Sequence, residues 1–134
     1  MRHGDDDIVL KEVTKVHNEG LPNAVTAVRD VSLTIPAGRV TVLRGPSGSG
    51  KTTLLTLVGC LARPTSGRIL LGGEIVSALP ERFMTEVRRR TFGFIFQRFN
   101  LIRGLSALEN VMIPAYPLGV PHRRLAERAR ALLA

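Results

Sequence analysis

Cysteine, aromatic side chains and long apolar runs are scarce in this sequence of 134 residues. Its single cysteine, Cys60, excludes an internal disulfide and is typical of a reducing compartment. No run of about eighteen apolar residues occurs, so the sequence predicts no membrane-spanning helix. Residues 1–7 are polar and acidic, unlike a secretory signal. We therefore expect a cytosolic protein whose length fits one domain.

The formal charge of +8 raises the question of nucleic-acid binding. The positive residues are nearly all arginine, and they are scattered along the chain except at residues 88–90 and 123–124. Aromatic residues make up only 4% of the sequence, which leaves no obvious platform for stacking bases. We expect a solvated, arginine-rich surface and no nucleic-acid partner.

A glycine-rich segment gives the strongest signal in the chain. It reads Gly45, Pro46, Ser47, Gly48, Ser49, Gly50, Lys51, Thr52 and Thr53. Its glycines, lysine and first threonine satisfy the spacing of a phosphate-binding loop. Residues 39–44 before it are short and β-branched, which predicts a strand, and residues 53–58 after it predict a helix.

This segment predicts a nucleotide site for physical reasons. Glycines reach positive φ cheaply and let backbone N–H groups close on phosphate oxygens. The helix beginning near Gly50 would direct unsatisfied N–H groups and its positive dipole end at the same anion. Lys51 would reach the β- and γ-phosphates of ATP, and the Thr52 hydroxyl would ligate Mg²⁺. The alternative is a glycine turn that joins a strand to a helix.

The remaining pattern predicts an α/β fold in which an antiparallel β layer precedes a phosphate-loop core. We expect a strand over residues 8–16, one or two strands over 24–35, a helix to about residue 61 and a strand over 68–71. A helix over 81–90 should bury Phe83, Met84 and Val87. Residues 92–96 predict a strand buried on both sides.

The last part of the chain predicts two helices. Ser106 and Glu109 have the spacing of a capping box, so one helix should start there and Pro114 should limit it. Pro121 should open a second, amphipathic helix with Leu125, Ala129, Leu132 and Leu133 on its apolar stripe. That stripe runs to Ala134 with nothing downstream to cover it, so we expect a domain truncated before its C-terminal half.

Four segments together resemble the ATP-binding subunit of ATP-binding-cassette (ABC) transporters. They are residues 27–33, 45–55, 64–67, and 92–101 with 108–111. The resemblance is nearest to the class with the lipoprotein-release and macrolide-export ATPases. It implies a phosphate-loop NTPase core of the ABC type, with residues 1–134 as the N-terminal portion of a single ATP-binding domain.

The resemblance also implies site residues. ATP is held by residues 45–53, Mg²⁺ by Thr52 and Gln97, and Lys51 and Gln97 are the only catalytic groups in this chain. His17 lies where the family has an aromatic residue that stacks on adenine. The alternative for Gln97 is an amide that ends a strand and satisfies backbone groups, which would be favoured if the phosphate loop were absent. The alternative for His17 is an exposed turn histidine.

Partners follow from the same resemblance. The region from Gln97 to Leu105 would dock a transmembrane permease subunit, although its apolar side chains suit a core as well. A homodimer, or a pair of ATP-binding domains, would enclose the nucleotides at the cytoplasmic face of the plasma membrane, with export or release as the expected direction of transport.

Several family segments do not occur in residues 1–134: the acidic end of the Walker B strand, the signature segment and the switch histidine. The resemblance therefore implies nucleotide binding with little turnover by this chain alone. An inactive interaction module and another phosphate-loop NTPase or small-molecule kinase stay open as alternatives.

Overall fold

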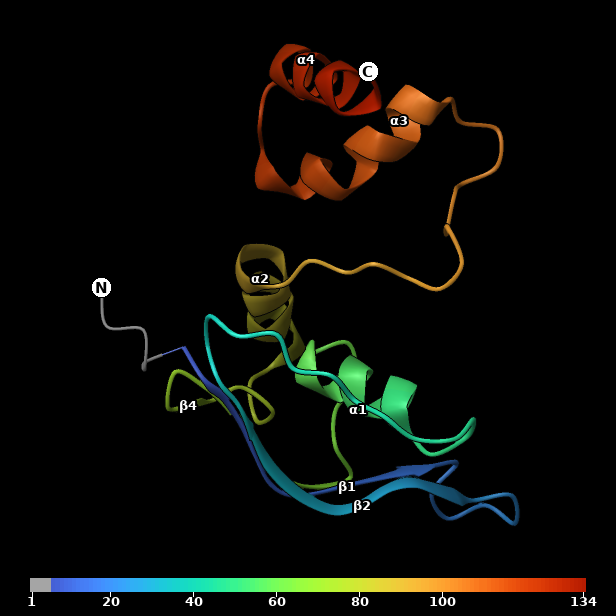
Figure 1. Ribbon diagram of the computed structural model, residues 1–134, viewed down its shortest axis with the longest axis vertical. Coiled ribbons are helices and arrows are strands. Elements are labelled where there is room, and N and C mark those ends of the chain that lie inside the picture. Colours follow the sequence, from blue (N-terminus) through green and yellow to red (C-terminus); the bar gives the residue numbers. More distant parts are fainter. Residues whose placement is uncertain (1–5) are drawn as a thin grey trace. The chain divides into compact units, whose positions relative to one another are not determined.

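The computed structural model describes residues 6–134, which divide into two compact units. Unit 1 ends at Phe92, and unit 2 comprises Gly93–Ala134. Unit 1 contains the sheet and two helices, and unit 2 is helical (Figure 1). In residues 6–134 no helix has the length and apolar character needed to cross a membrane.

The sheet of unit 1 has four strands, all paired antiparallel. They are β1 (Ile8–His17), β2 (Val25–Ile35), β3 (Ser66–Leu71) and β4 (Glu74–Ile75), in the order β2-β1-β3-β4. The predicted antiparallel layer is confirmed, and residues 24–35 contribute one strand. Both edges of β1 are occupied, by β2 and by β3, so β1 lies inside the sheet, whereas β2, the longest strand, lies at one edge.

Two helices complete unit 1, α1 (Lys51–Val58) and α2 (Glu81–Thr91). Figure 1 shows α1 above the β1–β2 ladder. Leu57 and Val58 of α1 pack with Leu10 of β1 and Met84 of α2 in one buried cluster. The helix ends earlier than the predicted residue 61. The shared core holds the last turn of α1 against the sheet, so the position of the glycine-rich loop depends on this packing.

One residue predicted on the apolar face of α2 is not buried. Met84 is buried and Val87 packs against the core, but Phe83 is exposed. The prediction for Phe83 is wrong because the buried stripe of this short helix is narrow. The Phe83 ring instead lies under the guanidinium of Arg82, with 4.6 Å between the guanidinium carbon and the ring centroid.

Two predicted strands do not form. Residues 39–44 and 92–96 are not helix or strand, and Val40 is 93% exposed. The expected burial of residues 92–96 on both sides is wrong as well, because Ile95 and Phe96 are exposed. A strand needs a hydrogen-bonded neighbour, and within residues 6–134 the sheet order gives neither segment one.

Unit 2 contains α3 (Ala107–Met112), a 3₁₀ helix, η1 (Ile113–Leu118), and α4 (His122–Leu133). The capping box is confirmed: Ser106 Oγ accepts from the Glu109 N–H, and Glu109 accepts from the Ser106 N–H. Met112 packs with Leu125, Ala126 and Ala129.

The apolar stripe of α4 is covered only in part, as the sequence predicted for a stripe with nothing downstream to cover it. Leu125 and Ala129 are buried, whereas Leu132 and Leu133 are exposed. The contact with α3 involves the first two turns of α4 and leaves the last turn uncovered.

Candidate functional site

The start of α1 is the feature around which the site is built. Gly50 is the N-cap residue, and no side chain caps the helix. The first intrahelical bond runs from the Leu54 N–H to the Gly50 carbonyl, over 2.8 Å. The four amides from Gly50 to Thr53 therefore have no intrahelical acceptor. An uncapped helix start with four free N–H groups is suited to receive an anion.

Lys51 folds its side chain back over the loop. Its Nζ lies 2.8 Å from the Gly45 carbonyl oxygen, 2.6 Å from that of Pro46 and 3.2 Å from Ser49 Oγ. The ammonium donates to all three oxygens, which keeps a positive charge beside the free amides. A phosphate arriving at the helix start would offer stronger, charged acceptors to the same ammonium.

The glycines of the loop are not equivalent. Gly50 has a φ of +86°, and a Cβ there would lie 2.1 Å from the Ala27 carbonyl oxygen of β2. At Gly45 a Cβ would meet Ser49 Oγ at 2.7 Å, whereas at Gly48 it would meet nothing within 4 Å. Gly50 is thus required for two reasons, positive φ and close approach to β2. This contact fixes the helix start against the sheet.

A cavity of about 380 Å³ opens between β2 and the loop. Its lining includes the three cationic residues Arg29, Arg44 and Lys51, and no acidic residue. The cavity is contained within unit 1. A hollow lined by cations and by uncapped amides favours a polyanionic ligand.

Thr52 occupies the second position of α1 and is exposed. Within residues 6–134, no three His, Cys, Asp or Glu side chains form a metal site. A hydroxyl beside a phosphate-binding helix start nevertheless fits Mg²⁺, which binds through one or two protein oxygens together with phosphate oxygens. The Thr52 hydroxyl is therefore a candidate ligand for such an ion.

His17 ends β1 and is exposed. The β1–β2 ladder pairs it with Val25, two residues before the Ala27 whose carbonyl lies against Gly50. The register therefore brings His17 to the same end of the sheet as the start of α1. This connection could not be derived from the sequence, because it depends on the pairing of β1 with β2.

Gln97 and the region up to Leu105 belong to unit 2. The Gln97 side chain is exposed, and so are the apolar side chains of Phe99, Leu101, Ile102 and Leu105, with Phe99 at 92%. In this unit the region is therefore surface and not core. Next to it lies an apolar hollow of about 510 Å³ bordered by residues 101–105 and Leu133.

Asn110 lies in the segment 108–111 of the family resemblance, and the sequence assigned it no role, yet its side chain holds the loop before α3 in place. Its Oδ1 accepts from the Ile102 N–H over 2.7 Å. Its Nδ2 donates to the carbonyls of Ile102, Leu105 and Ser106. The only sign of this role in the sequence was an asparagine inside a short helix. Its partners lie in the preceding loop, and the sequence does not reveal the path of that loop.

Known proteins resemble this chain in sequence. The family model for ABC transporters matches residues 28–134. A macrolide export ATP-binding/permease protein of Hyphomonas neptunium is 48% identical over 95% of this chain and 20% of its own length. A lipoprotein-releasing system ATP-binding protein of Cereibacter sphaeroides is 43% identical, over 94% of this chain and 56% of its own.

A solved structure supports the fold. It is a dimeric ATP-binding cassette in a post-hydrolysis state, bound to ADP and Pi. Its TM-score is 0.83 at 37% identity, covering 92% of this chain and 54% of that one. The predicted ABC-type fold class is confirmed. The chain spans about half the length of this cassette, and between 20% and 56% of the length of the two relatives above.

Both lines of comparison lead to one assignment. The matched family model covers more than half of the chain, and the relatives in the two comparisons are ATP-binding components of membrane transporters or isolated cassettes. The chain therefore belongs to the ABC transporter family, as a member of its ATP-binding subunits.

Proposed function

We propose that this chain holds Mg-ATP at the start of α1 and contributes to an ATPase that drives a membrane transporter. One observation carries the proposal: four helix-start amides without a cap lie beside the Lys51 ammonium. Residues 45–53 form the phosphate site. The similar cassette bound to ADP and Pi supports nucleotide as the ligand.

Lys51 would exchange its carbonyl partners at Gly45 and Pro46 for β- and γ-phosphate oxygens. Thr52 and Gln97 would hold Mg²⁺, through a hydroxyl and an amide oxygen respectively. When bound, the ion supplies charge neutralisation between the phosphates. Gln97 lies in an irregular, exposed stretch, which lets its side chain change position with the nucleotide state.

The partners are proposed on the same basis. Residues 97–105 expose four large apolar side chains in one loop, a surface suited to a transmembrane permease subunit. A second ATP-binding domain, or a second copy, would complete the nucleotide site. The chain would then lie at the cytoplasmic face of the plasma membrane. The names of the relatives favour export or lipoprotein release.

We expect residues 1–134 alone to release phosphate from ATP only at the background rate. The cavity beside Lys51 has no carboxylate in its lining to polarise a water molecule. A phosphate-release assay on the purified chain, with Lys51→Ala as the blank, measures this. Turnover well above that blank would show that the catalytic groups are wrongly assigned. Turnover restored by mixing in the C-terminal half of a relative would support completion by groups outside these residues.

His17 is proposed to contact adenine. His17→Ala should weaken ATP binding about two- to tenfold, because one ring contact is lost. His17→Tyr should bind at least as well as the parent, since its ring offers more area. Inorganic tripolyphosphate has no base, so its affinity for the site, measured by competition with ATP, should be the same in His17→Ala and in the parent. His122→Ala is the matched control in unit 2. Equal ATP affinity in His17→Ala and His122→Ala would remove the adenine contact.

A further inference from the structure

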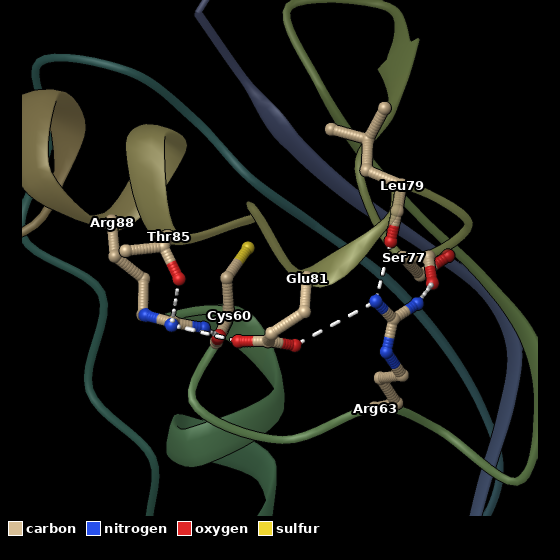
Figure 2. Close-up of polar contacts among 7 residues, drawn as sticks. All are labelled: Cys60, Arg63, Ser77, Leu79, Glu81, Thr85 and Arg88. Atoms are coloured by element: carbon tan, nitrogen blue, oxygen red, sulfur yellow. Dashed lines mark hydrogen bonds and ion pairs between the residues drawn. The ribbon is translucent and has the colours of Figure 1, made fainter. Parts of the chain in front are cut away.

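Two arginines and one glutamate join the end of α1 to the start of α2 (Figure 2). Glu81 Oε1 accepts from Arg88 Nη2 over 2.8 Å, and Glu81 Oε2 lies 3.6 Å from Arg63 Nη2. Arg63 also donates to the carbonyls of Ser77 and Leu79. The sequence did not predict this cluster, because its residues come from the loop after α1, the loop before α2 and α2 itself.

Arg88 makes the contact that reaches α1. Its Nη1 donates to the Cys60 carbonyl oxygen over 2.6 Å, just beyond the last residue of the helix. The Cys60 carbonyl lies just outside the helix, after the C-cap Gly59, and a cation at this end is favoured by the helix dipole. The Arg88 side chain is 22% exposed, and the contact is partly buried.

The backbone at Cys60 is strained. Its φ is +57°, which is costly for a residue with a Cβ, and its side chain is buried. The Leu61 N–H turns back to the Thr56 carbonyl, which closes the end of the helix. Burial raises the pKa of the Cys60 thiol, and the Arg88 charge acts in the opposite direction. A strained turn of this kind persists only where its surroundings hold it.

We propose that Arg88, oriented by Glu81, is a positioning residue for the nucleotide site and acts through the end of α1. The inference rests on the function proposed above. A helix of eight residues is about 12 Å long and behaves as a short rigid rod. Gly50 holds its start against β2, and Arg88 holds its end against α2. Releasing the end tilts the rod and misdirects the amides of residues 50–53.

The ion pair between Glu81 and Arg88 is not by itself a strong source of stability. Glu81 is 65% exposed, and exposed pairs contribute little to stability. The hydrogen bond from Arg88 holds the pKa of Glu81 below its usual value, so the carboxylate stays ionised to a lower pH than an unpaired glutamate does. The Glu81 carboxylate accepts from Nη2 and so fixes the orientation of the Arg88 guanidinium. The other terminal nitrogen, Nη1, then donates to the Cys60 carbonyl.

Arg90 offers a matched control on the same helix. It also pairs with a glutamate of α2, Glu86, but its side chain is 73% exposed. Arg88→Ala and Arg90→Ala remove the same side chain and charge from one helix. They differ in burial and in the contact with the end of α1, so the contact is read from hydrogen exchange at the start of α1, and stability is measured separately.

The experiment uses the complete gene product. Binding of a fluorescent ADP analogue is titrated at a temperature far below unfolding, and urea unfolding is measured without nucleotide. Arg88→Ala should weaken nucleotide binding about two- to thirtyfold. Arg90→Ala should leave it unchanged. Arg88→Lys should fall between Arg88→Ala and the parent, because one ammonium replaces a fork that reaches three acceptors, the Cys60 carbonyl, Glu81 Oε1 and Thr85 Oγ1.

Hydrogen exchange supplies a readout that a purely structural role would not move. Arg88→Ala should speed exchange at the amides of residues 51–54 in the nucleotide-bound protein, and Arg90→Ala should not. Lower stability with unchanged affinity and unchanged exchange there would overturn the proposal. If Arg88→Ala does not fold, Arg88→Lys provides the test. Nucleotide affinity and hydrogen exchange equal to those of the parent in Arg88→Lys would then overturn the proposal. If Lys51→Ala also binds normally, the proposed function itself fails.

Discussion

Lys51→Ala is expected to lower ATP affinity about ten- to hundredfold. The substitution removes charge-assisted hydrogen bonds to phosphate that are worth about 1.5–3 kcal/mol. It also leaves the carbonyls of Gly45 and Pro46 without the ammonium that they accept from in the structure. Isothermal titration calorimetry with ATP, in the presence of Mg²⁺, measures the change directly. Lys51 is partly exposed, so the folded state should tolerate the substitution.

Thr52→Ala is the companion variant that separates charge from metal. It lies one residue along the same helix, so both variants perturb the same turn. We expect it to weaken ATP binding mainly when Mg²⁺ is present and to have little effect in a chelator. Lys51→Ala should lower affinity under both conditions. If both variants bound ATP as tightly as the parent, the phosphate site would have to lie elsewhere.

Gly50→Ala should destabilise unit 1 by about 2–5 kcal/mol, because two costs add at one position. A φ of +86° is unfavourable for alanine, at about 1–2 kcal/mol. The new Cβ would also lie 2.1 Å from the Ala27 carbonyl oxygen, and forcing backbone apart costs about 1–3 kcal/mol more. Urea unfolding followed by circular dichroism tests this. Nucleotide affinity should fall as well, since the start of α1 must move away from β2.

Gly48→Ala is the control for this prediction. It has a similar φ of +78°, but a Cβ there meets nothing within 4 Å. It should carry only the backbone cost, about 1–2 kcal/mol. Equal destabilisation by the two substitutions would mean that the approach of Gly50 to Ala27 does not matter, and that the helix start is not fixed by β2.

Local signals in the sequence predicted many elements correctly. The capping box at Ser106 and the strand over residues 8–16 each depend on neighbours a few residues away. The glycine-rich loop belongs to this class too. Its spacing is local, and the structure places the predicted helix directly after it.

Predictions that needed a distant partner succeeded less often. Residues 39–44 and 92–96 have strand composition, but strand formation requires a neighbour, and none pairs with them among residues 6–134. Phe83 has the correct helical spacing, but burial requires a surface opposite. The composition of a segment indicates which secondary structure it favours, but tertiary packing decides whether that structure forms.

The sequence by itself determined that a helix would start beside a lysine and a run of glycines, because loop spacing, helix propensity and dipole are properties of a few adjacent residues. Only the tertiary structure decided what holds that helix. Gly50 lies against Ala27 of β2, and Arg88 reaches Cys60 from α2. These contacts join residues more than twenty positions apart, and only the folded chain brings such residues together.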